Sequence, residues 1–85
     1  MIEFESYEDI PDDFTGVCKT IANNIFHMKD GKSHNEIGPA IIWSKSDYNW
    51  CYKGMCYYGN PEFTIESWKE FVEELKRKEE LKIFI

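Results

Sequence analysis

The 85-residue sequence predicts a single α+β domain, a small antiparallel β-meander of four to five strands with one C-terminal amphipathic helix packed on it. Two observations support this class. Between residues 15 and 58, apolar and polar residues alternate with a period of two and are broken by turn residues, which is typical of β-hairpins. Between residues 64 and 80, apolar residues recur every three or four positions, which is typical of a helix. A charged segment, residues 1–13, precedes both regions.

The β region is divided by residues that favour turns. Asn23-Asn24 separates the first two strands, and Lys45–Asp47 separates the third from the fourth. Gly38-Pro39 opens the third strand, because proline is tolerated at the first residue of a strand. The predicted strands are 17–22, 25–29, 38–44, 48–53 and 55–58.

The aromatic strand 48–53 has one face suited to lie beneath the helix. Trp50 and Tyr52 share this face, since side chains two residues apart point the same way along a strand. Tyr57 and Tyr58 follow, and we expect them to be exposed anchors for a partner, a role in which tyrosine is favoured. Few cations accompany these rings, so a stacking surface for single-stranded nucleic acid is not favoured.

The helix has clear end signals. Thr64 is a suitable N-cap, Glu66 lies in the first turn and the basic residues 76–78 lie near the C-terminal end, as the helix dipole prefers. Residues 81–85 either extend the helix or form a final strand, and their alternation leans towards strand. The predicted buried face of the helix consists of Ile65, Trp68, Phe71, Val72 and Leu75.

Residues 30–40 form the most distinctive motif, Asp-Gly-Lys-Ser-His-Asn-Glu-Ile-Gly-Pro-Ala. Gly31 and Gly38 supply the positive φ that tight turns need, and Pro39 fixes φ as the chain leaves the second turn. Between the turns, His34 is expected to hydrogen-bond the loop backbone and to fix its conformation. A partial echo follows 23 positions after Gly31, at Gly54, where an aromatic strand again ends in Lys-Gly with one residue missing.

The region from Ile10 to Trp68 resembles small phage-encoded proteins with a MORN-like NGKxHRxxGPA repeat motif. The resemblance implies hairpin repeats and a phage or mobile-element origin, and it brings no catalytic residues. Asn35 stands where the motif has Arg, Ile37 stands where it has Asp, and only one full repeat is present. The matching segments are Ile10-Pro11, Phe14-Thr15-Gly16, residues 30–43, residues 50–54, Phe63-Thr64 and Glu66-Ser67-Trp68.

The formal net charge of −6 is concentrated in the acidic leader, residues 1–13, which has six acidic residues and no Lys or Arg. Residues 14–85 are charge-balanced. This pattern argues against binding nucleic acid by phosphate neutralisation and favours a basic partner surface. The alternative is that the leader only keeps an aromatic-rich protein in solution. The acidic residues are Glu3, Glu5, Glu8, Asp9, Asp12 and Asp13.

Three cysteines, Cys18, Cys51 and Cys56, predict free and partly buried thiols, because their number is odd. No His pair has the spacing of zinc ligands, so no metal or other cofactor is expected. The N-terminal residues lack a signal-peptide pattern, and no apolar run approaches the ~20 residues of a membrane span. We therefore expect a cytoplasmic protein, in the host cytoplasm if it is phage-encoded, with no membrane partner.

No nucleophile or oriented base accompanies His34 in the sequence, so we do not expect an enzyme. The function predicted from these features is non-enzymatic binding: a phage-type protein that attaches to a host protein, for instance a defence or nucleic-acid enzyme, and changes its activity. The alternative is a structural, self-assembling β-repeat module, which would form a homo-oligomer. The identity of the partner is not encoded in any motif of the chain.

Overall fold

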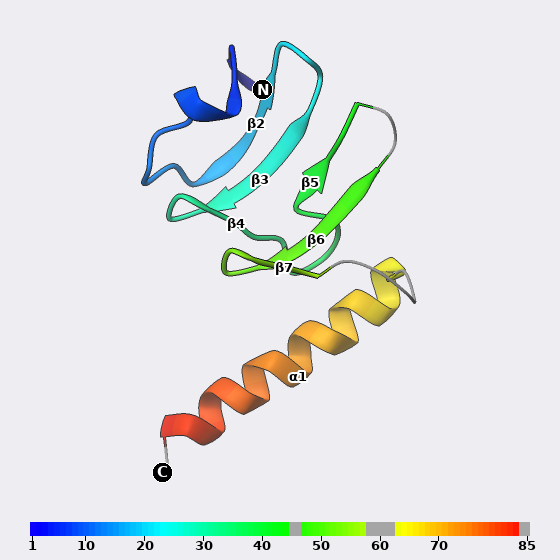
Figure 1. Cartoon of the computed structure of the whole chain (residues 1–85). Coiled ribbons are helices and arrows are strands. Elements are labelled where there is room, and N and C mark those ends of the chain that lie inside the picture. Colours follow the sequence, from blue (N-terminus) through cyan, green and yellow to red (C-terminus); the bar gives the residue numbers. More distant parts are fainter. Residues whose placement is uncertain (45–46, 58–62, 84–85) are drawn as a thin grey trace.

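The computed structural model describes residues 1–44, 47–57 and 63–83. It consists of a mixed β-sheet, a short 3-10 helix and one long α-helix (Figure 1). The α+β class is therefore confirmed. The elements are β1 Ile2–Phe4, the 3-10 helix η1 Tyr7–Asp9, β2 Gly16–Thr20, β3 Ile25–Lys29, β4 Lys32–Ser33, β5 Ile41–Ile42, β6 Tyr48–Tyr52, β7 Met55–Tyr57 and α1 Ile65–Ile83.

The strand order is β1-β2-β3-β5-β6-β7, and β4 pairs with β3 beside this path. All pairs are antiparallel except β1 with β2, which are parallel. The sheet is therefore mixed and has more strands than the predicted meander of four to five. A parallel pair requires a crossover connection, and here η1 and residues 10–15 return the chain to the start of β2.

Two β-hairpins repeat the same turn. Asp30 and Gly31 join β3 to β4, and Lys53 and Gly54 join β6 to β7, all four with positive φ. Positive φ at both central residues is the requirement of a type I′ turn, whose twist matches that of the flanking strands. The repeat is confirmed, but the predicted alignment was wrong by one residue. Lys53 is equivalent to Asp30 and Gly54 to Gly31, so the two turns align at an offset of 23 positions without a missing residue.

The sheet has a core on each face. Cys51 of β6 is fully buried on one face, where it joins Cys18, Phe26 and Ile41. Successive side chains of a strand point to opposite faces, so its neighbours Trp50 and Tyr52 lie on the other face and pack beneath α1. Helix α1 lies along the β6–β7 side of the sheet, and η1 lies on the β2–β3 side (Figure 1). The centre of β6 is thus buried on both faces.

Helix α1 begins as predicted, because the Thr64 Oγ1 accepts a hydrogen bond from the Ser67 N–H at 3.1 Å. Trp68 and Val72 are buried, as predicted, but Ile65 is 56% exposed. The helix meets the sheet only from its second turn, so the first apolar residue of the predicted face lies beyond the contact. Residues 81–83 continue the helix, so the first of the two alternatives is confirmed for them and the preference for a strand was wrong. Residues 84 and 85 lie outside the described residues.

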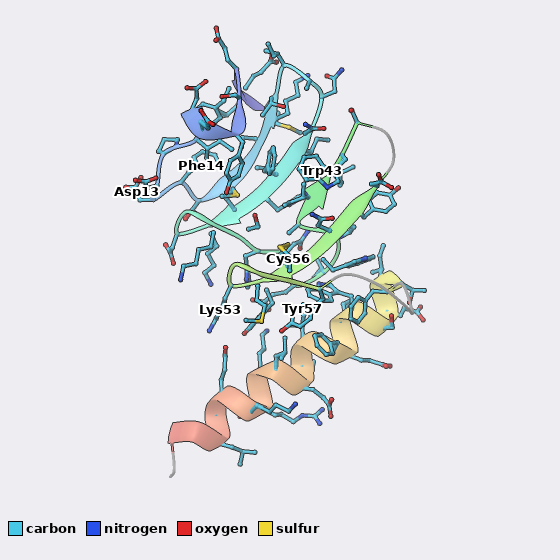
Figure 2. The ribbon with its side chains drawn as sticks, in the orientation of Figure 1. Asp13, Phe14, Trp43, Lys53, Cys56 and Tyr57 are labelled. Carbon is cyan, nitrogen blue, oxygen red and sulfur yellow. A yellow bond between two sulfur atoms is a disulfide. The ribbon has the colours of Figure 1, made fainter. Side chains whose placement is uncertain are left out.

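The predicted free thiols at Cys51 and Cys56 were wrong, because these residues form a disulfide across β6 and β7 (Figure 2). The hairpin register places them directly opposite each other, with their Cα atoms 4.0 Å apart. Cys18 remains a free, buried cysteine, and burial raises the pKa of its thiol. Structural disulfides are rare in reducing compartments, so the cysteines give no support to the expected cytoplasmic location.

Candidate functional site

The six acidic residues of the leader are all exposed, although the segment that carries them is folded. Ile10 is 8% exposed and belongs to the core, and the rings of Phe4 and Phe14 meet edge-on at 5.7 Å. The leader is therefore no loose tail. Its carboxylates are displayed on a backbone that β1, η1 and these apolar anchors hold in place.

The carboxylates of the leader have few partners among the residues that the structure describes. Glu3 pairs with Lys19 at 3.7 Å, and it is the only one of the six with an ion pair among the described residues. The Asp9 carboxylate accepts a hydrogen bond from the Ser6 N–H at 3.2 Å, which closes the capping box of η1. The other charges face solvent and leave this end of the molecule acidic.

Gly31 fixes the end of the leader against the first hairpin. A Cβ atom at Gly31 would lie 1.6 Å from the Asp12 carbonyl oxygen, and Gly31 has a φ of +77°. Its N–H donates to the Phe14 carbonyl at 2.9 Å, and the neighbouring Asp30 N–H donates to the Thr15 hydroxyl at 2.9 Å. Only glycine fits this close approach, so Gly31 positions Asp12 as well as turning the hairpin.

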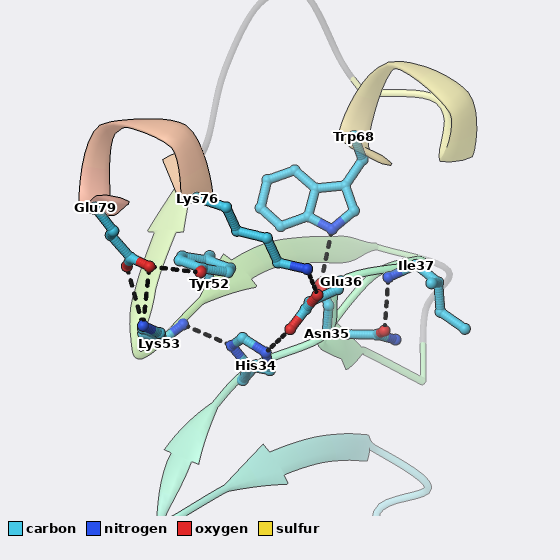
Figure 3. Close-up of polar contacts among 9 residues, drawn as sticks. All are labelled: His34, Asn35, Glu36, Ile37, Tyr52, Lys53, Trp68, Lys76 and Glu79. Carbon is cyan, nitrogen blue, oxygen red and sulfur yellow. Dashed lines mark hydrogen bonds and ion pairs between the residues drawn. The ribbon is translucent and has the colours of Figure 1, made fainter. Parts of the chain in front are cut away.

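His34 joins the two hairpins (Figure 3). Its Nδ1 accepts the Lys53 N–H at 2.9 Å, and its Nε2 lies 3.2 Å from a Glu36 carboxylate oxygen. Both contacts are satisfied when the proton is on Nε2. Lys53 has a left-handed φ of 51°, which this hydrogen bond helps to hold. The side chain of His34 is 7% exposed, and its contacts are those of a residue that fixes backbone conformation.

Glu36 extends this contact to the helix through an ion pair with Lys76 (Figure 3). The hydrogen bond from Lys76 holds the pKa of the Glu36 carboxyl below its ordinary value, with a smaller contribution from His34, and the same contact raises the pKa of Lys76. Thus an ordered row of His34, Glu36 and Lys76 ties the loop of the motif to α1.

Asn35 is a central residue of this loop, although its role was not predicted from the sequence. Its amide donates to the Pro39 carbonyl and accepts from the Ile37 N–H, both at 3.0 Å. The backbone carbonyl of Asn35 accepts a hydrogen bond from the Trp68 indole N–H at 2.7 Å, so the loop is also fixed to the helix (Figure 3). The signal was available, because Asn side chains commonly hydrogen-bond backbone groups two residues ahead in turns.

This loop also explains why the predicted strand 38–44 was too long. The hydrogen bonds of the Asn35 side chain hold residues 35–39 in a loop, so these residues do not pair with a neighbouring strand. Strand β5 contains only Ile41–Ile42. Gly38 is buried, and its φ is outside the left-handed region, so the positive φ predicted there was wrong. Pro39 contributes its carbonyl to the loop.

A second contact between sheet and helix involves the second hairpin turn. The Lys53 ammonium lies 3.0 Å from a Glu79 carboxylate oxygen, and the Tyr52 hydroxyl donates to the same carboxylate at 3.1 Å (Figure 3). Burial, followed by the Glu79 hydrogen bond, raises the pKa of Tyr52. The ring of Tyr52 also lies 5.0 Å from that of His34. These contacts hold the hairpin against the helix.

Tyr57 lies between the sheet and the helix (Figure 2). It is half-buried, with its ring centroid 4.9 Å from that of Phe71 and 6.0 Å from that of Trp68. Much of its ring is therefore used in the core, which leaves less of it for the predicted interface. Tyr58 lies outside the described residues.

The described residues contain no group of three or more His, Cys, Asp or Glu side chains that could hold a metal ion. In the same part of the chain, no helix is long and apolar enough to cross a membrane. Comparison with protein-family models, with curated proteins and with solved structures gives no match to this chain. The MORN-like resemblance remains a prediction.

Proposed function

We propose that this chain is a non-enzymatic binding protein of phage type that attaches to a basic surface of a host protein and changes the activity of that protein. The observation that supports this function is the display of six exposed carboxylates on a folded leader without a single Lys or Arg. A fixed array of like charges attracts a partner of opposite charge and orients it during encounter. A defence or nucleic-acid enzyme, whose own ligand site is basic, is the kind of host protein that fits.

The arrangement of the fold supports a binding role over catalysis. His34, the residue an enzyme would most plausibly use, already has both ring nitrogens engaged by Lys53 and Glu36. These contacts serve the backbone and the helix, as described above. The proposed site of action is in the host cytoplasm, and the proposal involves no cofactor, nucleic acid or membrane.

The experiment compares the protein with a variant in which the six acidic residues of the leader are changed to Gln or Asn. A host protein captured by the parent chain is identified, purified and measured by surface plasmon resonance between about 50 and 300 mM salt. We expect slower association and a flatter salt dependence for the variant, because screened charge attraction acts mainly on the association rate. A control variant with Glu66 and Glu70 of the helix changed to Gln should bind as the parent does.

Association that is indifferent to both salt and the six substitutions would mean that the leader serves only solubility.

The second candidate function, self-assembly, is suggested by exposed apolar groups on the sheet, with Ile2 54%, Val17 39% and Tyr48 54% exposed. Light scattering distinguishes it, because a stable homo-oligomer that captures no partner supports assembly instead.

A further inference from the structure

A cleft of about 590 Å³ opens on the face of the sheet opposite helix α1. One wall is the segment Glu5–Tyr7 of the leader, and the floor is the surface of β3 and β5. Its volume lies within the range of about 300–1,000 Å³ that is usual for ligand sites. The contacts of Asn35 and Glu36 with Trp68 and Lys76 of the helix do not involve this cleft.

Three aromatic rings form a continuous apolar surface in the cleft. Phe26 is 2% exposed and lies at the base, with its ring centroid 5.3 Å from that of Tyr7 and 5.9 Å from that of Trp43. Trp43 follows β5 (Figure 2) and is half-buried. Tyr7 is 55% exposed. The faces of Trp and Tyr rings attract cations that lie within about 6 Å of their centroids.

Some polar groups that line the cleft have no hydrogen-bond partner in the described part of the chain, whereas Ser6, Asn24 and Ser33 each have one. Among the described residues, Glu5 is the only charged one in the lining, and its carboxylate has no ion pair with any of them. Thr20 is 5% exposed, yet its hydroxyl makes no hydrogen bond to another described residue. The side-chain amide of Asn49 likewise has none within that region. No buried side-chain nitrogen or oxygen atom of the described residues lacks a hydrogen-bond partner, so the Thr20 hydroxyl is reached by the solvent of the cleft and is open to a ligand.

From the aromatic walls, the carboxylate of Glu5 and the open polar groups of Thr20 and Asn49, we propose that this cleft binds an arginine side chain of the partner protein. The guanidinium is planar, stacks on aromatic rings and presents five N–H donors. It would stack between Tyr7 and Trp43 and pair with Glu5. Thr20 and Asn49 would accept its remaining hydrogen bonds. The proposal deepens the function proposed above, because it places one anchor of a basic partner beside the acidic leader.

The test needs no partner protein. N-acetyl-arginine methylamide is titrated into the ¹⁵N-labelled full chain, and N-acetyl-citrulline methylamide, a neutral analogue of nearly the same shape, is the matched ligand. We expect saturable shifts of the Trp43 indole N–H and of the Glu5 and Thr20 amides with the arginine probe. The citrulline probe should bind at least about tenfold more weakly, which corresponds to ~1.4 kcal/mol.

Variants locate the binding. Glu5→Gln should weaken the arginine probe at least about threefold without affecting folding, because Glu5 is exposed and unpaired in the described structure. Trp43→Leu should abolish the saturable shifts. The matched control is Glu66→Gln, which removes an equally exposed carboxylate from the first turn of α1 and should change nothing. Native dispersion of the amide spectrum verifies that each variant is folded.

Equal binding of the arginine and citrulline probes would overturn the proposal, since the cleft would then not recognise charge. Shifts that are spread over the acidic leader and persist in Glu5→Gln would also overturn it, because they indicate unspecific attraction. Either failure can occur while partner capture still depends on the leader, so the cleft proposal can fail separately from the proposed function. Conversely, if the free chain binds the arginine probe but partner capture is indifferent to the six leader substitutions, which include Glu5, the cleft is not an anchor for the partner and that part of the proposal is overturned.

Discussion

Replacing Trp68 by Ala tests the packing between helix and sheet. The side chain is completely buried and contacts the rings of Trp50, Phe63 and Phe71 at centroid distances of 5.7, 5.0 and 5.8 Å. It also donates the 2.7 Å hydrogen bond to the Asn35 carbonyl. Truncating a buried Trp costs about 3–5 kcal/mol, and the orphaned carbonyl places this site near the upper end of that range.

A loss of about 4–5 kcal/mol is large for this chain, because 85 residues correspond to a total stability of about 4–13 kcal/mol. The melting temperature should therefore fall by about 15–40 °C, or the variant should be unfolded at room temperature. Urea denaturation followed by circular dichroism at the helix band measures the free energy of unfolding. Trp68→Phe, which keeps an aromatic ring but removes the N–H, should lose about 1–3 kcal/mol.

Ile65→Ala is the matched control. Ile65 lies on the helix face that the periodicity predicts to be buried, but it is 56% exposed, so its truncation should change stability by ~0.5 kcal/mol or less. If Trp68→Ala unfolds within about 1 kcal/mol of the parent, the helix does not pack on the sheet as described. A larger loss for Ile65→Ala than for Trp68→Ala would reverse the assignment of the buried face.

Three further predictions concern the contacts that fix the hairpins. His34→Ala should lose about 1–2 kcal/mol in urea denaturation, because the Lys53 N–H loses its acceptor, and should keep partner binding once folded; a stable variant without binding would contradict this. The contact with Lys76 lowers the pKa of Glu36 from its ordinary value of 4.5. The ionised carboxylate therefore stabilises the folded state above that pH, and this contribution is lost as the pH falls through the lowered pKa. The stability difference between parent and Glu36→Gln, from thermal melts, should therefore shrink from about pH 7 to about pH 3, and a constant difference would refute it. Thiol titration in urea without reductant should find one free thiol, and reducing the Cys51–Cys56 bond should cost about 2 kcal/mol; three free thiols would exclude the disulfide.

The features predicted correctly from the sequence have local physical causes. The turns at Gly31 and Gly54 follow from the positive φ that a two-residue hairpin needs, which is set by the turn residues themselves. The start of α1 at Thr64 and the burial of Trp68 follow from the cap and from the 3.6-residue period. The acidic charges of the leader could be counted in the sequence, but their fixed arrangement in space could not be predicted from it.

The features that the sequence did not reveal depend on which segments meet in space. The parallel pairing of β1 with β2 and the cleft beneath Tyr7 arise from registers between segments that no local pattern specifies. The Cys51–Cys56 disulfide, in contrast, has a local cause, because the two-residue turn at Lys53-Gly54 places the two cysteines opposite each other. Ile65 has the periodicity of a core residue but lies beyond the edge of the contact. By itself, the sequence determined the class of fold, the hairpin turns, the helix and the acidic character. Only the tertiary structure decided which faces are covered and which acceptors stay open to a ligand, because burial is a property of the neighbours that the fold brings together.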